Sequence, residues 1–537
     1  MTHLDWAILV AYLLGIVALA IVVGRKQKSQ EDYYLGGRRM PAWQVALSVM
    51  ATQVSAISLI GAPAFIALKP GGGLVWLQYE FAVPLAMILI ILILVPVYHR
   101  MKSITIYEYL ENRYGVATRS MISLVFLISR GLGTGVALLA TGIVTSACLG
   151  LPLTPTIILI GIVSMLYTTI GGIKADIYSD IIQLVILWLG TFVCIYIVWN
   201  LLGDSAFTFA ADSQPRLITI DFASTGFGDG KTFAFWPMLI GGLFLYFSYY
   251  GCDQSESQRI LTTSDARSAQ KALLMNGLLR FVLVLTYCFF GVLLLSFLEK
   301  NPTFAATLQG VQPDFLVPSF LIEYVPKGLL GLVVAGIFAA SMSSVDSAMN
   351  ALSAATWRDF LARQFPKMAA FPQERTVRIS RLLTIIWGLI ATAFALYLSG
   401  GMETVIVLVN KIGSAFYGPV LAVFLLGIMT RYANQTGAIV GLLSGVTVNL
   451  ILWQGFQHTV SWLWWNPIGV FVSITVGYII SIVTKRRRSV AISENIPLLF
   501  ADLSSGRATP LRYSAILFIA FMIMVATTYL IGYKLTQ

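Results

Sequence analysis

Long apolar runs separated by short polar loops dominate the pattern of this chain. Fourteen runs are long enough to cross a bilayer as helices, since a span needs about 20 mostly apolar residues. They cover approximately residues 4–23, 42–68, 75–98, 117–149, 153–172, 177–201, 233–251, 268–298, 327–356, 376–400, 404–429, 434–455, 462–483 and 511–533. The pattern therefore predicts an all-α polytopic membrane protein with about 14 transmembrane helices.

Lysine and arginine are distributed unevenly between the loops that join these runs. If the N-terminus lies outside, the inside loops hold 26 of them and the outside loops hold 6. Three more, Arg130, Arg280 and Lys411, fall within apolar runs. Because basic residues are enriched in cytoplasmic loops, we expect a protein of the cytoplasmic membrane with both termini extracellular or periplasmic.

Composition supports this class and excludes others. The chain is 58% hydrophobic and 11% charged, whereas a soluble chain carries about 25% charged residues. The net charge of +11 is explained by the cytoplasmic loops, so no nucleic-acid partner is indicated. The loop sequence TGFGDGKT resembles a phosphate-binding loop but lacks its first glycine and a preceding strand, so no nucleotide is expected. No metalloprotease or nucleophile motif indicates an enzyme.

The ninth run contains the stretch GIFAASMSSVDSAMN, which is rich in small and hydroxyl-bearing residues. Ala340, Ser343, Ser344 and Ser347 are spaced i, i+3, i+4 and i+7 and therefore share one helix face. Asp346 lies beside that face, and a carboxylate at membrane depth costs about 2.5–3.5 kcal/mol on insertion scales. Close helix packing would explain the serines alone. Together with Asp346, they favour a polar site for a small hard cation.

Two runs are interrupted by polar residues, glycine or proline. The second run contains Thr52, Gln53, Ser55, Ser58, Gly61 and Pro63, and the seventh reads GGLFLYFSYYGCDQSESQR. An ordinary proline kink would explain the second run. However, interrupted helices at corresponding positions of two halves indicate an inverted-repeat transporter. The second and seventh runs are five apart, which predicts two five-helix halves.

Several ionisable residues fall at membrane depth. Asp180 lies near the start of the sixth run and Glu80 lies early in the third, while Lys411 stands between two apolar stretches. Asp180 is also compatible with a solvated helix N-terminus. Lys411 needs a partner if it is buried. That partner is either an internal carboxylate such as Glu80 or an anionic solute.

The chain resembles the sodium/solute symporter family, which includes sodium–glucose and sodium–sialic acid cotransporters. The resemblance covers roughly residues 5–483 and is carried by DYYLGGRRMPAWQVALSVMATQVSAIS, GGIKADIYSDIIQ, DQSESQR, FAASMSSVDSAMN and YGPVLAVFLLGI. It implies a LeuT-type five-plus-five inverted-repeat core that works by alternating access, with sodium ion co-transported. It also implies a main sodium site formed by carbonyls of Ala51, Val54 and Ala340 and by hydroxyls of Ser343 and Ser344.

The resemblance also places a possible second sodium site and a solute site. The second sodium site would use Asp180, Ser343, Asp346 and Ser347, with Asp346 in place of a hydroxyl of the sialic acid transporters. Residues at or near solute-binding positions are Gln53, Ser55, Ser58, Glu80, Arg130 and Lys411. Glu80 matches a carboxylate that binds sugar hydroxyls in glucose transporters, and Arg130 lies about one turn from a carboxylate-binding arginine position.

The resulting hypothesis is a sodium-coupled symporter that imports a small polar organic solute. A sugar acid, a sialic acid or a monocarboxylate is favoured over a neutral sugar or polyol, and a sensor or channel-like protein with the same fold is a further alternative. We expect an extra helix and loop at 1–41, repeats at 42–201 and 233–429, an outside loop at 202–232, and flanking helices at 430–537.

Overall fold

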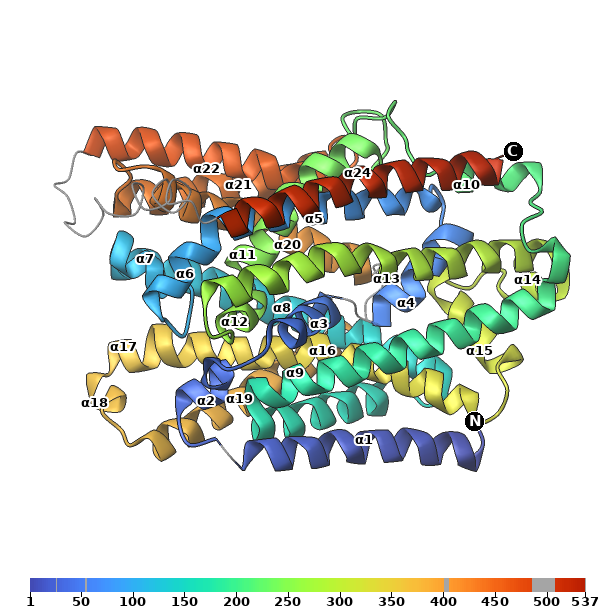
Figure 1. Cartoon of the computed structure of the whole chain (residues 1–537), viewed down its shortest axis with the longest axis horizontal. Helices are drawn as coiled ribbons and strands as arrows, with labels where there is room; N and C mark the ends of the chain where they lie inside the picture. Colours follow the sequence, from blue (N-terminus) through green and yellow to red (C-terminus); the bar gives the residue numbers. More distant parts are fainter. Residues whose placement is uncertain (26, 54–55, 400–404, 485–507, 537) are drawn as a thin grey trace.

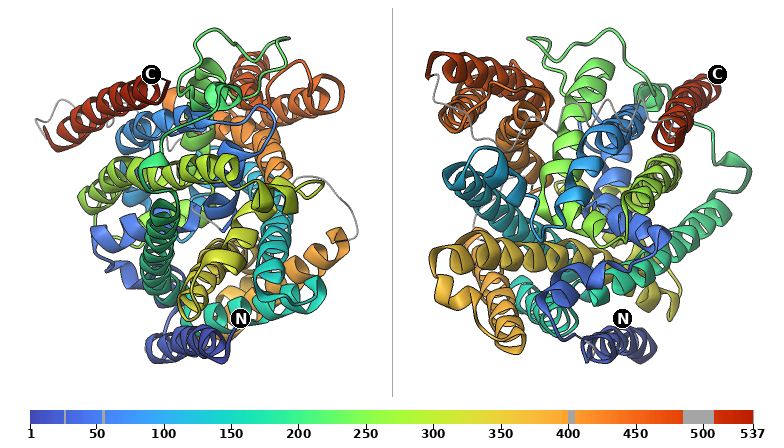
Figure 2. Two further views of the ribbon diagram at one scale, coloured as in Figure 1. Left: turned by 90° about the vertical axis from the view of Figure 1, so that its right-hand side faces the viewer. Right: turned by 60° about the vertical axis from the view of Figure 1, so that its left-hand side comes forward.

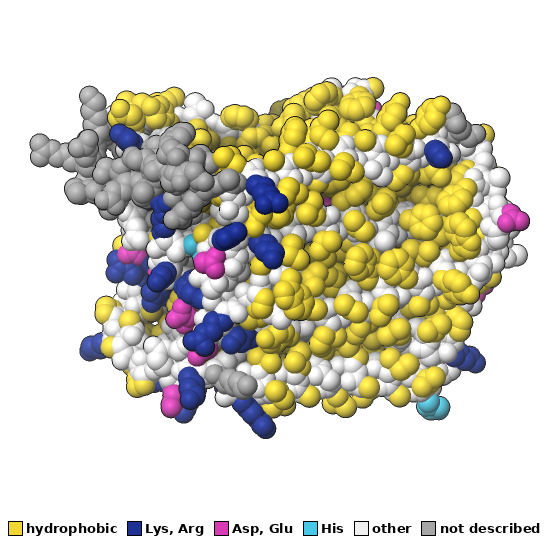
Figure 3. All heavy atoms as spheres, in the orientation of Figure 1, with side chains coloured by type: hydrophobic (Ala, Val, Ile, Leu, Met, Phe, Trp, Pro, Cys, Tyr) yellow, Lys and Arg dark blue, Asp and Glu magenta, His cyan; other side chains and the backbone are white. Residues whose placement is uncertain are grey.

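The computed structural model describes residues 1–25, 27–53, 56–399, 405–484 and 508–536, and these residues are almost entirely helical. The apolar helices run side by side along the long axis of the molecule, and both termini lie at the same end (Figure 1). Lysine and arginine side chains gather at the opposite end, while apolar side chains cover the middle (Figure 3). This is the surface expected of a bundle that crosses a bilayer.

The first part of the chain begins with helices α1 to α9. Its elements are α1 (His3–Gly24), α2 (Gln30–Leu35), η1 (Gly36–Arg38), α3 (Ala42–Gln53), α4 (Ala56–Ala67), η2 (Leu74–Phe81), α5 (Ala82–Leu89), η3 (Ile90–Leu94), α6 (Val95–Met101), α7 (Glu108–Arg113), α8 (Val116–Leu149) and α9 (Leu153–Leu202).

A long connection then leads into the second part. The connection holds η4 (Gly203–Ser205), η5 (Ala211–Ser213) and α10 (Gln214–Leu217). The elements that follow are η6 (Pro237–Gly241), α11 (Gly242–Cys252), α12 (Gln254–Leu261), α13 (Ala266–Lys300), α14 (Pro302–Thr307), η7 (Pro313–Phe315), α15 (Leu316–Tyr324), α16 (Leu329–Ala355), η8 (Thr356–Leu361), α17 (Ala362–Gln364), α18 (Pro366–Ala369), α19 (Gln373–Leu398), α20 (Val405–Met429), α21 (Gln435–Phe456), α22 (Trp462–Thr484) and α24 (Ala508–Thr536).

The predicted number of spans is not confirmed. Among the described residues, 11 helices are long and apolar enough to cross a membrane, or up to 12 if one bent pair counts as a span. Two predicted runs, 153–172 and 177–201, lie within the continuous α9, whose backbone is kinked where Gly172 has φ 54°. The run predicted at 233–251 corresponds to η6 and the short α11. Helix number depends on how such kinks are treated, and apolar runs alone do not decide this.

Both predicted interruptions are present. Helix α3 and the part of α4 from Ser58 to Ala67 are bent by 53° relative to each other. Helix α11 ends at Cys252, and extended backbone at Asp253 separates it from α12. The Asp253 side chain accepts a hydrogen bond from the Ser255 backbone N–H and thereby caps α12. Helix α12 is not one of the membrane-spanning helices, and all of its residues are buried.

Helix α16, which carries the serine-rich stretch, is the most enclosed span. It packs against α1, α8, α9 and α19. Helices α1 and α24 lie on opposite sides of the bundle (Figure 2). The contact between α1 and α16 is close because Gly331 lacks a side chain. A Cβ atom there would lie 2.6 Å from the Cα atom of Asp5.

The buried Asp5 carboxylate fastens α1 to the start of α16. Its Oδ1 atom accepts hydrogen bonds from the backbone N–H groups of Gly328, at 2.7 Å, and Gly331, at 2.8 Å. Its Oδ2 atom accepts from the backbone and hydroxyl of Thr2. The N–H groups at a helix N-terminus have no partner within the helix and carry partial positive charge, so a carboxylate suits this position.

Replacing Asp5 with alanine is expected to lower the free energy of unfolding by about 2–3 kcal/mol, because charge-assisted hydrogen bonds are lost and two buried N–H groups lose their partner. Denaturant titration in detergent micelles measures this change. His3→Asn is the matched control, since His3 is exposed in the same helical turn. Equal stability of the Asp5→Ala and His3→Asn proteins would contradict the anchoring role.

Candidate solute cavity and cation site

A cavity of about 530 Å³ lies beside the break between α3 and α4. It is lined by residues of the broken helix, η2, α8, α11, α13, α16, α20 and α22. It extends to Lys69, Pro70 and Pro313, which follow α4 and precede α15 at the end of the molecule that holds both termini (Figure 1). The cavity is therefore reached from the end opposite the cluster of basic side chains.

Ion pairs tie the helices together at the basic end. The Arg119 guanidinium lies 2.6 Å from both Asp359 and Glu111. Asp359 is buried and also accepts hydrogen bonds from the hydroxyls of Thr105 and Ser123. These contacts join α7, α8 and η8 into one closed structure at that end. The ion pairs hold the basic end together, and the cavity opens toward the end that holds both termini.

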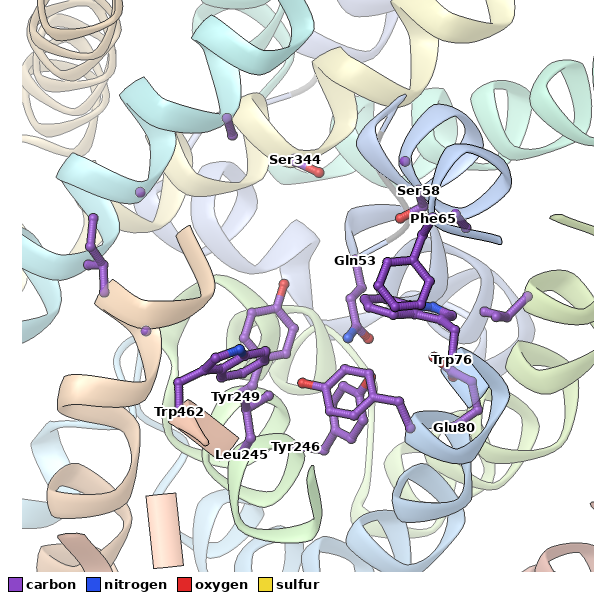
Figure 4. A pocket seen from close by; sticks show the side chains of 18 of the residues that line it. Gln53, Ser58, Phe65, Trp76, Glu80, Leu245, Tyr246, Tyr249, Ser344 and Trp462 are labelled. Carbon is purple, nitrogen blue, oxygen red and sulfur yellow. The ribbon is translucent and has the colours of Figure 1, made fainter. Parts of the chain in front are cut away.

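Aromatic side chains form much of the cavity wall. They come from the broken helix, η2, the segment before η6, α11, α13, α20 and α22 and are Phe65, Trp76, Tyr79, Phe233, Tyr246, Tyr249, Tyr287, Tyr417 and Trp462. Figure 4 shows several of them around the same space as Gln53, Ser58 and Glu80. Such a wall provides apolar faces together with phenol and indole donors, which suits a small organic molecule with both polar and apolar parts.

Four charged groups of the cavity are paired with one another, while Lys69 at its mouth pairs with Asp314. Arg280 of α13 makes a two-pronged ion pair with Glu80 of η2, at 2.6 Å from Nε to Oε2 and 3.1 Å from Nη2 to Oε1. The same guanidinium donates to the side-chain oxygen of Gln53 and to the Tyr250 hydroxyl. The Glu80 and Arg280 side chains are thus held rigidly, and their charges balance.

A second pair lies on the cavity floor. Arg130 of α8 is 3.1 Å from the carboxylate of Asp253 and donates to the Ser255 hydroxyl. Its guanidinium also lies over the ring of Tyr249, 5.2 Å from the centroid. The Nε atom of Arg130 is buried and has no hydrogen-bond partner among the described residues. One donor of Arg130 is therefore unsatisfied in this arrangement.

The hypothesis that Lys411 pairs with Glu80 is wrong. Glu80 is occupied by Arg280, whereas the Lys411 ammonium donates to the Gln457 side chain at 2.9 Å. Although Ile412 and Gly413 line the cavity, Lys411 is not among its lining residues. The lysine lies near the start of α20, where its long side chain reaches across to the end of α21.

Sequence analysis did not assign a role to Arg280 or Asp253. Arg280 lies in an apolar run, and an arginine there must face the protein interior, so its position was a usable signal. The sequence did not indicate that Glu80 is the partner of Arg280, because the two residues are 200 positions apart. Asp253 lies in the motif DQSESQR, whose polar residues follow the break in the seventh run.

The serine face of α16 meets the end of α3. The Ser343 hydroxyl donates to the carbonyl of Ala51 at 2.8 Å, and the Ser344 hydroxyl donates to the carbonyl of Thr52 at 2.7 Å. Ala340 lies one turn earlier on the same helix. Val54, a predicted sodium ligand, and Ser55, a predicted solute-binding residue, lie outside the described residues. Hydroxyl and carbonyl oxygens from two helices thus come together, as a hard cation such as sodium requires.

An arginine lies among the residues predicted for a second sodium site. The Nη2 atom of Arg259 is 3.2 Å from Asp180 and also donates to the Ser347 hydroxyl. The Ser48 hydroxyl donates to the same Asp180 oxygen at 2.5 Å. The sequence interpretation placed Arg259 in a cytoplasmic loop, but its side chain is only 1% exposed. The reason is that α12 folds back against α3 and α16.

Asp346 has different hydrogen-bond partners from Asp180. Its Oδ1 atom accepts a hydrogen bond from the Ser347 backbone N–H at 2.5 Å. Its Oδ2 atom has no hydrogen-bond partner among the described residues, although it is fully buried. Ser347 is therefore the residue that connects the surroundings of Asp180 and Asp346.

Comparison with known proteins identifies relatives along most of the chain. The model of the sodium:solute symporter family matches residues 33–445. A sodium/sialic acid symporter of Aliivibrio fischeri is 28% identical over 480 residues, which cover 89% of this chain and 92% of that protein. The sodium-coupled monocarboxylate transporter 2 of Bos taurus is 29% identical over 465 residues, covering 85% and 71%.

A solved structure has the same fold. It is a Na⁺-coupled sialic acid symporter in a substrate-bound outward-open state, with a TM-score of 0.78 and 24% sequence identity. The match covers 90% of this chain and 98% of that structure. The predicted LeuT-type inverted-repeat fold is therefore confirmed, although the number of fourteen helices is not.

Proposed function

Since the chain belongs to the sodium:solute symporter family and is a sodium-coupled symporter of a small polar organic solute, we propose that its solute carries a carboxylate. The observation that carries this proposal is the unpartnered Nε–H of Arg130, a buried donor of a cavity-lining guanidinium. Guanidinium groups bind carboxylates through charge-assisted hydrogen bonds. Relatives that carry sialic acids and monocarboxylates support the same class.

One observation favours a second candidate, a neutral sugar or polyol. Glu80 is balanced by Arg280, and Arg130 by Asp253, so the cavity holds no excess positive charge from these four residues. Hydroxyl groups would find both donors and acceptors on the Glu80–Arg280 pair. A carboxylate must instead compete with Asp253 for Arg130.

A sodium-dependent thermal-shift screen on purified protein separates these candidates. The compounds are sugars, polyols, sugar acids, sialic acids, monocarboxylates and vitamins, each added with and without sodium. We expect carboxylates to raise the melting temperature only when sodium is present, because a ligand stabilises the state that it binds. Stabilisation by neutral sugars or polyols alone would show that the solute is a neutral sugar or polyol and not a carboxylate.

The oxygen atoms between α3 and α16 are proposed to hold the main sodium ion. Their proposed set is the carbonyls of Ala51, Val54 and Ala340 and the hydroxyls of Ser343 and Ser344. Sodium binding there would draw α16 and the broken helix together and thereby stabilise the state that accepts the solute. Asp180, Ser343, Asp346 and Ser347 stay a proposed second sodium site, which requires Arg259 to move away from Asp180 and Ser347.

The main site predicts a specific effect of removing one hydroxyl. Ser343→Ala and Ser344→Ala are each expected to raise the sodium concentration that gives a half-maximal thermal shift by about tenfold, which corresponds to about 1.4 kcal/mol of binding free energy. Sodium-induced thermal shift without solute measures this directly. Ser341→Ala is the matched control, because Ser341 is buried on α16 like Ser343 but its hydroxyl donates to the carbonyl of Ile337 on its own helix. Unchanged sodium dependence in both test variants would contradict the site.

The orientation in the membrane follows from the charges. We propose that the basic end and the Arg119 ion pairs lie on the cytoplasmic side, because basic residues are enriched in cytoplasmic loops. Both termini and the mouth of the cavity then face outward in the plasma membrane. The proposed repeats comprise 42–201 and 233–429, flanked by 1–41 and 430–537 and joined by the outside loop at 202–232. The family consists of transporters, and the proposed mechanism involves no covalent step.

A further inference from the structure

Beneath the floor of the solute cavity lies a carboxylic acid that the transport site described above does not use. Glu256 belongs to α12 and its side chain is completely buried. Neither of its carboxylate oxygens makes a hydrogen bond of standard geometry among the described residues, and the Tyr249 side chain offsets only part of the cost of burial. A buried charge without hydrogen bonds is costly, so this position favours the protonated, neutral form of the side chain.

The two arginines that surround Glu256 are already engaged by other carboxylates. Arg130 pairs with Asp253, and Arg259 pairs with Asp180. Glu256 interacts electrostatically with both guanidinium groups, but neither forms an ion pair with it. Within this group of five residues there are three acidic and two basic side chains. Uptake of one proton would make the group neutral.

Other titratable side chains lie on the elements around Glu256. The phenols of Tyr249 and Tyr250 on α11 and of Tyr417 on α20 interact with it electrostatically. Of the helices packed against α12, α3 carries no titratable side chain and α16 carries only Asp346. Helices α2 and α13 also pack against α12. Their titratable groups are Glu31, Asp32, Tyr33 and Tyr34 on α2 and Arg267, Lys271, Arg280, Tyr287, Cys288, Glu299 and Lys300 on α13.

Glu256 is close to the cavity but separated from it by one layer of side chains. Arg130, Asp253, Tyr249 and Tyr417 all line the cavity and all interact with Glu256. Tyr249, seen in Figure 4, extends its ring toward the space occupied by Gln53 and Trp462. Its phenol both lines the cavity and interacts with the Glu256 side chain. Burial raises the pKa of Glu256 to about 7, despite the opposing effect of Arg259 and Arg130.

We propose that Glu256 is a proton-binding site under the solute cavity, and that its protonation controls the affinity of the transporter for an anionic solute. The second half of this proposal rests on the proposed carboxylate solute. When Glu256 is ionised, the floor carries an excess negative charge that competes with the solute for Arg130. When Glu256 is protonated, this competition is removed. An anionic solute should therefore bind more tightly at low pH and should take up a proton as it binds above neutral pH.

Infrared titration of the purified protein in lipid, with sodium and without any solute, tests the proton site. The measured signal is the C=O stretch of protonated carboxyl groups between about pH 5 and pH 9, a range that includes both the usual and the raised pKa of glutamate. We expect a carboxyl group with a midpoint near pH 7 that is present in wild type and in Glu374→Gln, an exposed control. It should be absent in Glu256→Gln and should return with a changed midpoint in Glu256→Asp.

The absence of such a group in wild type, or its persistence in Glu256→Gln, would overturn the proton site. The wild-type measurement decides this even if the variants fail to fold. For the second half, sodium-driven uptake of pyruvate, a sialic acid and myo-inositol is measured in proteoliposomes. For an anionic probe, we expect KM to rise by up to about tenfold from pH 7 to pH 8 in wild type and to stay constant in Glu256→Gln.

Each uptake result has a separate meaning. A pH-independent KM for a transported anion in wild type would overturn the control of affinity by Glu256. Uptake of myo-inositol alone would overturn the carboxylate solute and with it the second half of the proposal, while the infrared result would still decide the proton site.

Discussion

Replacing Arg259 with methionine is expected to lower the free energy of unfolding by about 3–5 kcal/mol, the usual cost of removing one partner of a buried ion pair. The guanidinium satisfies Asp180, Ser48 and Ser347 in a place where its own side chain is 1% exposed. Its removal would leave the Asp180 carboxylate buried without a counter-charge. Denaturant titration in detergent micelles measures the loss.

Two further variants show whether this loss comes from the Asp180 charge. Arg259→Met combined with Asp180→Asn should recover part of the stability, because no unpaired charge then remains. Arg363→Met is the matched control, since Arg363 pairs with Glu111 but is 45% exposed. Exposed pairs contribute at most about 1 kcal/mol. A double variant less stable than Arg259→Met would show that the guanidinium acts through packing or through the serines.

Solute uptake is expected to fall by about a hundredfold or more when Arg280 is replaced with glutamine. The replacement leaves Glu80 buried without its partner and releases Gln53 and Tyr250 from the guanidinium. The cost of about 3 kcal/mol for an unpaired buried charge corresponds to a factor of that size. Sodium-driven uptake in proteoliposomes, with the best compound of the thermal-shift screen, measures the effect.

The sodium-induced thermal shift should persist in Arg280→Gln, because Arg280 contacts none of the described oxygens of Ala51, Thr52, Ser343 and Ser344. This separates loss of solute binding from misfolding. Lys271→Gln serves as the control on the same helix, since Lys271 is exposed. The double variant Glu80→Gln with Arg280→Gln removes both charges and should regain stability but not uptake. Full uptake by Arg280→Gln would show that the Glu80–Arg280 pair is purely structural.

The sequence by itself determined the class of the protein and the character of its key helices. Bilayer thickness and the cost of exposing backbone in lipid allow few structures besides long apolar helices, so the spans were visible as apolar runs. The two interruptions were visible too, because clustered polar residues oppose a continuous apolar helix, whereas Gly61 and Pro63 lie inside the continuous α4. The serine face of α16 followed from the 3.6-residue period alone.

The tertiary structure decided which charges meet. Glu80 selects Arg280 rather than Lys411, and Asp180 selects Arg259, because the folding of η2, α12 and α13 brings these side chains within 3.2 Å. Electrostatic pairing in a protein interior depends on distances of a few ångströms, and helix patterns do not specify distances between remote segments. For the same reason only the structure reveals that Glu256 lies between two arginines that are already engaged by other carboxylates.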